Sequence, residues 1–334
     1  MSQLPPSPAG DVFYCFLSII LEGAPYIVIG TLISGFIDAF VPPRLMERLL
    51  PRNSVIAVLV SGLLGFIFPV CECAIVPVIR RLVNKGLPVS CAVTYMLAAP
   101  IINPIVAVST YSAFRGAFTS NAVEAAVLAG RPEWWIMGSR LGLGFLVSVL
   151  VGLALVAVSS RRILRPQILA ENAAHSEHSH AVGTADQRIS QALSTSMRDF
   201  LDTAMYFVIG VLITSVFNTR LMIQPNFTAA VTAIAGNNLT AIPGLMALAV
   251  VLSLCSTTDA FIAANLQGFS MAAKLAFLVF GPMVDLKLLF MYASVFQKRF
   301  VLLLVLALFI LIAVMAGGWF GALHALLPPI ASQI

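Results

Sequence analysis

The chain has 334 residues, of which 60% are hydrophobic and 10% are charged, and its mean hydropathy is +0.98. A soluble domain carries about 25% charged residues, so this composition excludes a soluble globular protein and indicates an integral membrane protein. The formal net charge of +5 does not indicate nucleic-acid binding, because Lys and Arg lie mostly in short loops, where they set membrane topology.

The apolar stretches are about 20 residues long or longer and show little alternation, which predicts transmembrane helices rather than the strands of a β-barrel. The first segment is expected at about 12–41 and contains Glu22 and Pro25. The next apolar run, about 55–83, carries prolines at Pro69 and Pro77, so it cannot be one plain helix. We predict that it is a helical hairpin that turns near Cys71.

The following segment, about 87–118, is predicted to break around Pro100, Asn103 and Pro104. One long uninterrupted helix is then expected at about 136–158. Residues 161–196 form an extended polar stretch that indicates a linker. Three histidines within 175–180 would at most buffer Zn²⁺, Ni²⁺ or Cu²⁺ transiently, and a solvated tail is the simpler interpretation.

The second half repeats the first. Glu22 aligns with Asp202 at a shift of 180 residues, Cys71 with Cys255 at 184, and Asn103 with Asp285 at 182. These three alignments lie at nearly the same sequence shift, which predicts two related membrane repeats. Their expected bounds are 11–160 and 197–322, on either side of the linker.

Basic residues fix the expected orientation. The clusters at 44–52, 80–85, 161–165 and 298–299 should all lie in the cytoplasm. This requires 55–83 to leave and return to one side, which gives each half three to five membrane segments and makes the halves inverted repeats. Both termini are then outside and the linker is cytoplasmic. If 55–83 were instead one broken crossing, the halves would be parallel and the basic residues 80–85 would lie outside.

Inverted repeats with broken helices are typical of secondary transporters, whose substrate sites lie near the bilayer midplane. We therefore expect the site where the two hairpin tips meet the other breaks. The candidate substrate-binding residues are Cys71, Glu72, Cys73, Pro100, Asn103, Pro104, Cys255, Ser256, Thr257, Thr258, Asp259, Pro282, Asp285 and Lys287.

Thiols favour thiophilic metals and metalloids, so Cys71, Cys73 and Cys255 are the candidate ligands of a trigonal arsenic(III) or antimony(III) centre. The alternative is that these cysteines only pack as small apolar side chains. The acidic residues Glu72, Glu22 and Asp202 are candidates for proton or cation coupling. Glu72 can equally cap the helix that begins at the break, and Asp202 can lie at the interface.

The remaining polar residues have structural alternatives as well. Asp285 and Lys287 can neutralise each other, and the hydroxyls of 256–258 can bond to frayed helix backbone. No cofactor is expected. The sequence has no Gly-rich nucleotide loop ending in Lys-Ser/Thr, so transport is expected to be secondary. The rival functions are a channel and a permease for another small anion or metal complex. A thiol oxidoreductase is less favoured, because one residue between Cys71 and Cys73 makes an awkward disulfide.

Three stretches of the sequence resemble a bacterial predicted-permease family. They are the stretch from Phe68-Pro-Val-Cys-Glu-Cys73 to Pro100-Ile-Ile-Asn-Pro104, Cys255-Ser-Thr-Thr-Asp259, and Pro282-Met-Val-Asp285. That family includes YraQ-type permeases and ArsP-type organoarsenical efflux permeases, and the resemblance covers nearly the whole chain except the linker. It implies a multi-pass inner-membrane permease. For the ArsP-type members it implies export of trivalent organoarsenicals and a role for membrane cysteines. The expected partners are a small-molecule or metalloid substrate and the lipid bilayer, and a homodimer is left open.

Overall fold

The computed structural model describes residues 8–40, 51, 53–115, 132–166, 185–222, 234, 238–266 and 268–326. Within these ranges the regular elements are helices, and a single isolated antiparallel bridge joins Leu164 to Phe296. The arginine loop at 44–52, apart from its described residue 51, and the three histidines at 175–180 lie outside the described residues.

The first half contains a long helix, a helical hairpin, a broken helix pair and a second long helix. These elements are α1 (Pro8–Phe40), α3 (Ser54–Ile67), α4 (Glu72–Asn84), α5 (Val89–Ala98), α6 (Pro104–Phe114) and α8 (Pro132–Val156), followed by the short α9 (Ser160–Ile163). The second half has the same order in α11 (Ala185–Met222), α13 (Asn238–Leu252), α14 (Thr258–Asn265), α15 (Met271–Met283), α16 (Leu286–Val295) and α17 (Lys298–Leu326).

The helices are long and apolar enough for a multi-pass membrane protein. Among the described residues, five spans meet this criterion, at Gly10–Phe40, Glu133–Val156, Asp186–Arg220, Met271–Val295 and Lys298–Trp319. The outer face of α17 exposes Leu302, Leu303, Ile310 and Val314, each more than 60% accessible. Such a face is stable only against lipid or another apolar surface. The prediction of an all-α polytopic membrane protein is confirmed.

The predicted breaks occur where local sequence forbids a continuous helix. Residues 68–71 separate α3 from α4, and Asn103 ends the gap between α5 and α6 by capping α6, accepting a hydrogen bond from the Ile105 amide at 2.9 Å. Asp285 caps α16 in the same way, with the Leu288 amide at 2.6 Å. Short polar side chains at these positions satisfy amides that a helix start leaves free.

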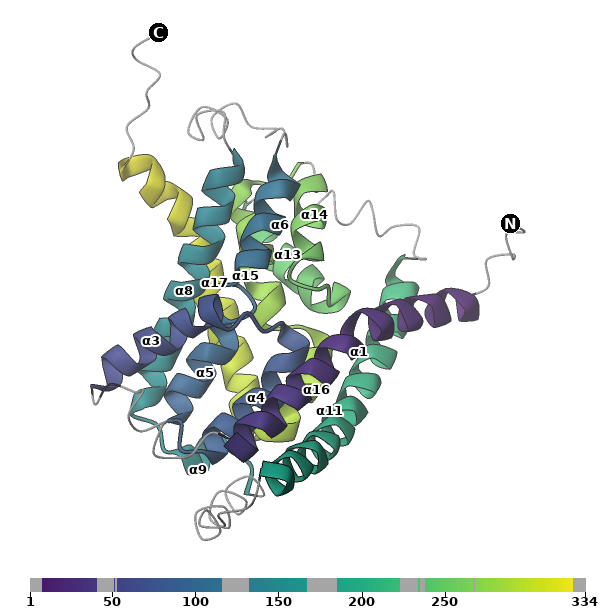
Figure 1. Ribbon diagram of the computed structural model, residues 1–334. Coiled ribbons are helices and arrows are strands. Elements are labelled where there is room, and N and C mark those ends of the chain that lie inside the picture. Colours follow the sequence, from purple (N-terminus) through teal and green to yellow (C-terminus); the bar gives the residue numbers. More distant parts are fainter. Residues whose placement is uncertain are drawn as a thin grey trace.

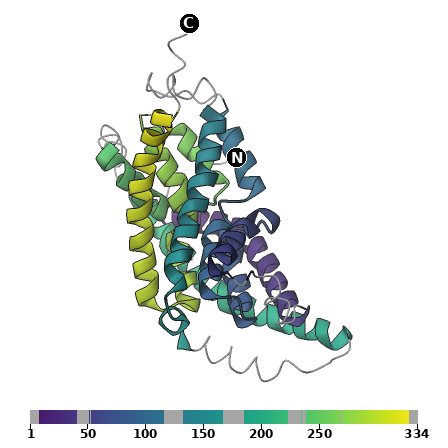
Figure 2. The same ribbon diagram turned by 90° about the vertical axis from the view of Figure 1, so that its left-hand side faces the viewer.

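The two hairpins lie in opposite halves of the bundle. In Figure 1, α3 and α4 of the first hairpin lie below α13 and α14 of the second, and Figure 2 shows the same division. This is the arrangement that inverted repeats require. All residues of α5 and of its counterpart α15 are buried, so both halves place the same element at the centre.

Charged side chains gather at the lower end of the bundle. Arg81 of α4 pairs with Asp199 of α11 at 2.7 Å, and the ammonium of Lys85 lies 3.5 Å from a carboxylate oxygen of Asp38 in α1. The Gln297 amide donates to the carbonyl of Ile163, which brings the end of α9 next to the start of α17. Three of the basic clusters used to predict orientation therefore lie at one end, as a common cytoplasmic side requires.

The long helices of the two halves, α1 and α11, pack side by side. Helix α11 begins inside the predicted linker, so residues 185–196 are helical rather than extended. Ser196 and the carbonyl of Ala192 lie directly against Gly35 of α1, where a Cβ atom would overlap them. Close packing on a small residue thus orders a polar segment that has little reason to be helical by itself.

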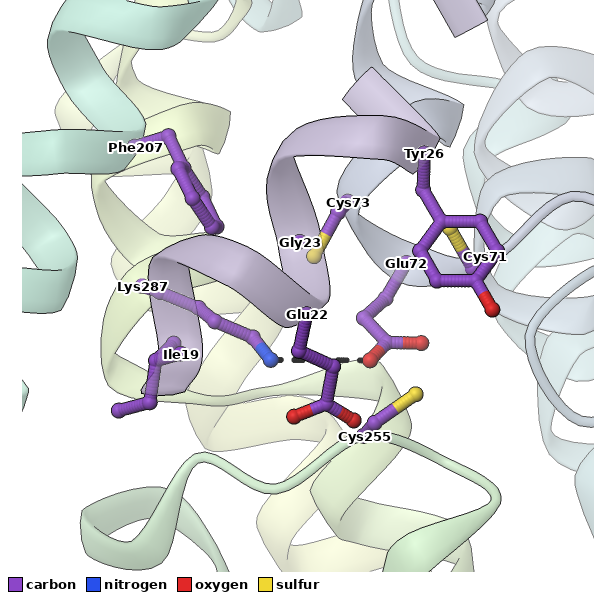
Figure 3. Close-up of a pocket in the computed structure, with 10 residues that line it drawn as sticks. All are labelled: Ile19, Glu22, Gly23, Tyr26, Cys71, Glu72, Cys73, Phe207, Cys255 and Lys287. Atoms are coloured by element: carbon purple, nitrogen blue, oxygen red, sulfur yellow. Dashed lines mark ion pairs between the residues drawn. The ribbon is translucent and has the colours of Figure 1, made fainter. Parts of the chain in front are cut away.

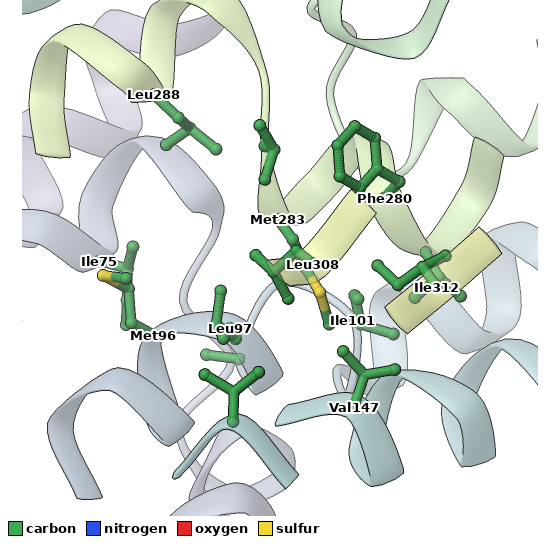
Figure 4. Packing of buried hydrophobic residues seen from close by; sticks show 14 of the residues in the cluster. Ile75, Met96, Leu97, Ile101, Val147, Phe280, Met283, Leu288, Leu308 and Ile312 are labelled. Atoms are coloured by element: carbon green, nitrogen blue, oxygen red, sulfur yellow. The ribbon is translucent and has the colours of Figure 1, made fainter. Parts of the chain in front are cut away.

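Buried apolar side chains from both halves form one core (Figure 4). Ile75, Leu97 and Ile101 from the first half lie close to Met283 and Leu288 from the second. The core therefore lies between the halves and holds both hairpins against each other.

One contact brings α1 next to the first hairpin and gives a testable prediction. A Cβ atom on Gly30 would lie 2.6 Å from the Cβ of Ala74 and 2.8 Å from its carbonyl oxygen. Because backbone cannot give way as a side chain can, Gly30→Ala is expected to destabilise the protein by about 1–3 kcal/mol. Thermal unfolding in detergent, followed by circular dichroism, measures the effect.

Gly138→Ala is the matched control, since a Cβ atom there meets nothing within 4 Å. In a helix interior this substitution should be neutral or stabilising by about 0.5–1 kcal/mol. Equal melting temperatures for the two variants would show that α1 does not depend on close contact with α4.

Candidate functional site

The tip of the first hairpin carries two thiols and a carboxylate. Cys71 is the residue before α4 and has extended backbone, with φ −72° and ψ 164°, and Glu72 is the first residue of the helix. Pro69 ends the preceding helical conformation, and the free amides at the start of α4 favour a negative charge there. Glu72 is 1% exposed and Cys73 5%, while Cys71 is partly exposed.

This tip opens onto a pocket formed by both halves (Figure 3). Its walls come from α1, α4, α11, the break between α13 and α14, and α16. The lining residues are Ile19, Glu22, Gly23, Tyr26, Cys71, Glu72, Cys73, Phe207, Cys255 and Lys287. Three thiols and two carboxylates thus share one pocket, and its free volume of about 10 Å³ leaves room for about one water molecule.

A buried lysine lies between two carboxylates at this pocket. The ammonium nitrogen of Lys287 is 3.6 Å from Glu72 Oε1 and 3.4 Å from Asp285 Oδ2, and it donates a hydrogen bond to the Ser253 carbonyl at 3.2 Å. All three charged residues are at most 3% exposed. Figure 3 shows the lysine and Glu72 pointing toward each other across the pocket. The predicted pairing of Asp285 with Lys287 is therefore present, and Glu72 joins it.

The tip of the second hairpin is held by side chains from other helices. Lys287 binds the Ser253 carbonyl, Asn218 Nδ2 donates to the Leu252 carbonyl at 3.2 Å, and Ser109 Oγ donates to the Thr257 carbonyl at 2.7 Å. Ser253 itself has a φ of +47°, which is unusual for a residue other than glycine. Side chains thus replace the hydrogen bonds that the broken helix lacks, as irregular backbone inside a membrane requires.

The two tips touch at equivalent positions of the repeat. Ser256 Oγ donates a hydrogen bond to Glu72 Oε2 at 3.2 Å, and these residues are 184 positions apart. This is the shift that aligns Cys71 with Cys255. A residue can touch its own repeat equivalent only near the axis that relates the repeats, so the two tips meet near that axis.

A second buried ion pair adjoins the tip and joins the predicted site residue Asp259 to Arg140, which is not among the predicted residues. Arg140 of α8 places Nη2 3.0 Å from both carboxylate oxygens of Asp259 and 2.9 Å from the Ser256 carbonyl. Its Nη1 donates to Thr110 Oγ1 at 2.7 Å. The signal was available, because a lone arginine inside an apolar helix is expensive and needs a buried partner.

Not all predicted site residues come together. Asn103 and Pro104 form the start of α6, Pro100 lies in the preceding turn, and Pro282 lies near the end of α15; none of them lines the pocket. Thr258 begins α14 and is exposed. Asp202 is 60% exposed and pairs with Arg80 at 3.1 Å, whereas its repeat equivalent Glu22 lines the pocket. The interfacial alternative therefore describes Asp202 better than a place at the site does.

The three thiols line the pocket without forming a preformed metal site. Within the described part of the chain, no three His, Cys, Asp or Glu side chains are close enough together to hold one metal ion. Any shared binding by Cys71, Cys73 and Cys255 would require these side chains to move closer together.

Comparisons with known proteins agree with this architecture. The family described as predicted permease, ArsP_1, matches residues 9–318. The UPF0718 protein YcgR of Bacillus subtilis is 38% identical over 308 residues, covering 91% of this chain and 94% of that protein. No solved structure matches significantly.

A second relative, from Streptococcus mutans, is named as a candidate subunit of a two-component membrane permease complex. It is 35% identical over 298 residues, which cover 89% of this chain and 91% of that protein. The family match extends from the beginning of α1 into α17 and includes both hairpins. The chain belongs to the ArsP_1 family of predicted permeases.

Proposed function

We propose that this permease is a secondary transporter that exports a small thiophilic solute, with trivalent organoarsenicals as the leading substrate class. The observation that carries the proposal is the pocket in which Cys71 and Cys73 from one hairpin tip share the lining with Cys255 from the other. Thiols bind soft metals and metalloids in preference to hard ions. Thiols from both tips are therefore suited to hold such a solute at the contact between the halves.

The closed pocket supports a mechanism with a conformational change. A volume of about 10 Å³ admits a water molecule but no larger solute, so the tips must separate before substrate enters. The tips belong to hairpins that lie in opposite halves of the bundle. Movement of one hairpin against the other would expose the thiols to one side of the membrane at a time, which is alternating access.

The charges support one orientation in the membrane, which decides how export would be measured. Arg81 and Lys85 lie at the same end as the α9 to α17 contact, and the positive-inside rule assigns this end to the cytoplasm of a bacterial inner membrane. In everted vesicles this end faces the external medium, so export appears as uptake into the vesicle.

The test is uptake of radiolabelled methylarsenite, arsenite and antimonite into everted vesicles containing the full-length protein. We expect saturable, energy-dependent uptake that is strongest for methylarsenite, because saturation distinguishes a transporter from a channel. Vesicles without the protein provide the background. If none of the three solutes is taken up above that background, the assigned substrate class is wrong, and non-saturating flux would instead indicate a channel.

A further inference from the structure

Five buried charged residues form one connected network around the hairpin tips. Glu72, Asp259 and Asp285 supply three carboxylates, and Arg140 and Lys287 supply two cations, all of them at most 3% exposed. Ser256 joins the two parts, because its hydroxyl donates to Glu72 and its carbonyl accepts from Arg140. The network therefore has one negative charge in excess if every group is ionised.

The excess charge falls on the part of the network at the pocket. Arg140 contacts both oxygens of Asp259 at 3.0 Å, so these two residues neutralise each other. Glu72 and Asp285 instead share the single ammonium of Lys287 at 3.6 and 3.4 Å. Glu72 Oε1 and Asp285 Oδ2 are also fully buried oxygens without a hydrogen-bond partner. An unneutralised charge at such a place is costly.

The geometry favours a proton over a metal cation as the missing positive charge. Lys287 already lies between the two carboxylates, where it would repel a second cation. Three of the other groups at the pocket are thiols, which are poor ligands for Na⁺, Ca²⁺ or Mg²⁺. A proton needs no coordination shell and forms a covalent bond with one carboxylate oxygen.

Both carboxylates lie at a helix start, which favours negative charge, but their hydrogen-bond partners differ in a way that selects Glu72. Asp285 Oδ1 accepts a short hydrogen bond of 2.6 Å from the Leu288 amide at the start of α16, an environment that stabilises its ionised form. The side-chain partner of Glu72 is the Ser256 hydroxyl at 3.2 Å. A hydroxyl can donate to a carboxylate and can also accept from a carboxyl group, so it suits both protonation states.

We propose that Glu72 binds a single proton that this permease exchanges across the membrane during each transport cycle. This inference rests on the proposed transport function. Besides Lys287 and Asp285 of α16, the groups that face Glu72 are Cys71 and Cys73 of α4, Cys255 and Asp259 of the second hairpin, and Glu22 and Tyr26 of α1. Glu22 is exposed and lines the same pocket, which provides a carboxylate between Glu72 and the surface.

The first experiment needs no substrate. Infrared difference spectra of the full-length protein in lipid nanodiscs, recorded across a pH titration, report the C=O stretch of protonated carboxyl groups. We expect one buried carboxyl band that is lost at high pH, absent from Glu72→Gln and unchanged in Asp202→Asn. Asp202 is the matched control, since it is an exposed membrane-helix carboxylate outside the pocket.

Ser256→Ala is a second variant that tests the same site if Glu72→Gln does not fold. It keeps the carboxyl group but removes its hydroxyl partner, so the band should persist and shift to higher frequency. The proposal is overturned if the band survives in Glu72→Gln, if ¹³C-labelling of aspartate rather than glutamate carboxyl groups shifts it, or if no protonated buried carboxyl group is detected. Replacing Na⁺ by choline should leave the titration unchanged, and dependence on Na⁺ would assign a metal cation instead.

The second experiment uses methylarsenite as the probe and a pH-sensitive dye inside everted vesicles. Wild-type protein should couple methylarsenite uptake to proton movement in a ratio of one, whereas Glu72→Gln should allow exchange of methylarsenite without proton movement. If methylarsenite is not transported but the infrared band behaves as expected, the substrate class fails and the proton site stands. If the wild type transports methylarsenite without proton movement, the substrate class stands and the proton site fails.

Discussion

Replacing Cys71 and Cys255 together by serine is expected to reduce methylarsenite uptake into everted vesicles at least tenfold. The two thiols belong to different hairpin tips and line the same pocket. Serine is close to cysteine in size but lacks the soft sulfur ligand that a trivalent arsenical binds. Loss of about 1.4 kcal/mol of binding free energy already lowers affinity tenfold, so the loss of two ligands should exceed that threshold.

Cys15→Ser is the matched control for this experiment. Cys15 lies in α1 and does not line the pocket, so its loss should leave uptake unchanged. Comparing initial rates over a range of methylarsenite concentrations separates weaker binding from slower transport. Full uptake by the double variant would mean that the thiols merely pack as small apolar groups and do not bind the substrate.

The largest effect on stability is expected from Arg140→Leu, which should lower the free energy of unfolding by about 3–5 kcal/mol. The substitution leaves Asp259 as a buried carboxylate without its cation, and it frees the Ser256 carbonyl and the Thr110 hydroxyl from their shared donor. Thermal unfolding of the purified protein in detergent measures the change.

The double variant Arg140→Leu/Asp259→Leu tests the cause of that loss. Removing both charges eliminates the buried unpaired carboxylate, so much of the stability should return. Asp202→Asn is the exposed reference, because breaking its pair with Arg80 should change stability by about 1 kcal/mol or less. A double variant as unstable as Arg140→Leu would show that packing around the arginine stem matters more than the charge.

The Arg140→Leu/Asp259→Leu variant also shows whether the ion pair serves folding alone or transport as well. The second hairpin tip would lose the donor that holds the Ser256 carbonyl, and Ser256 is the residue that contacts Glu72. A variant that is stable but transports poorly would mark Arg140 as a positioning residue for the pocket. A stable and fully active one would limit the pair to a role in folding.

The sequence by itself determined the breaks in the helices. Pro69, Asn103 followed by Pro104, and Asp285 act on their own backbone, by removing a donor, restricting a dihedral angle or capping a helix start. Such effects involve residues only a few positions apart, so they can be predicted without knowing the fold. The apolar stretches determined the membrane class for the same reason, because span length and side-chain hydropathy are local properties.

Only the tertiary structure decided which charged groups meet. Glu22 and Asp202 are equivalent in sequence, yet Glu22 lines the pocket and Asp202 pairs with Arg80 at the surface. The reason is that α1 and α11, which pack against each other, have different further neighbours: α4 lies against α1 and α16 lies against α11. The pairing of Arg140 with Asp259, 119 residues away, depends likewise on contact between helices α8 and α14. The face that a helix turns toward a distant partner is determined by packing of the whole bundle, which local sequence does not specify.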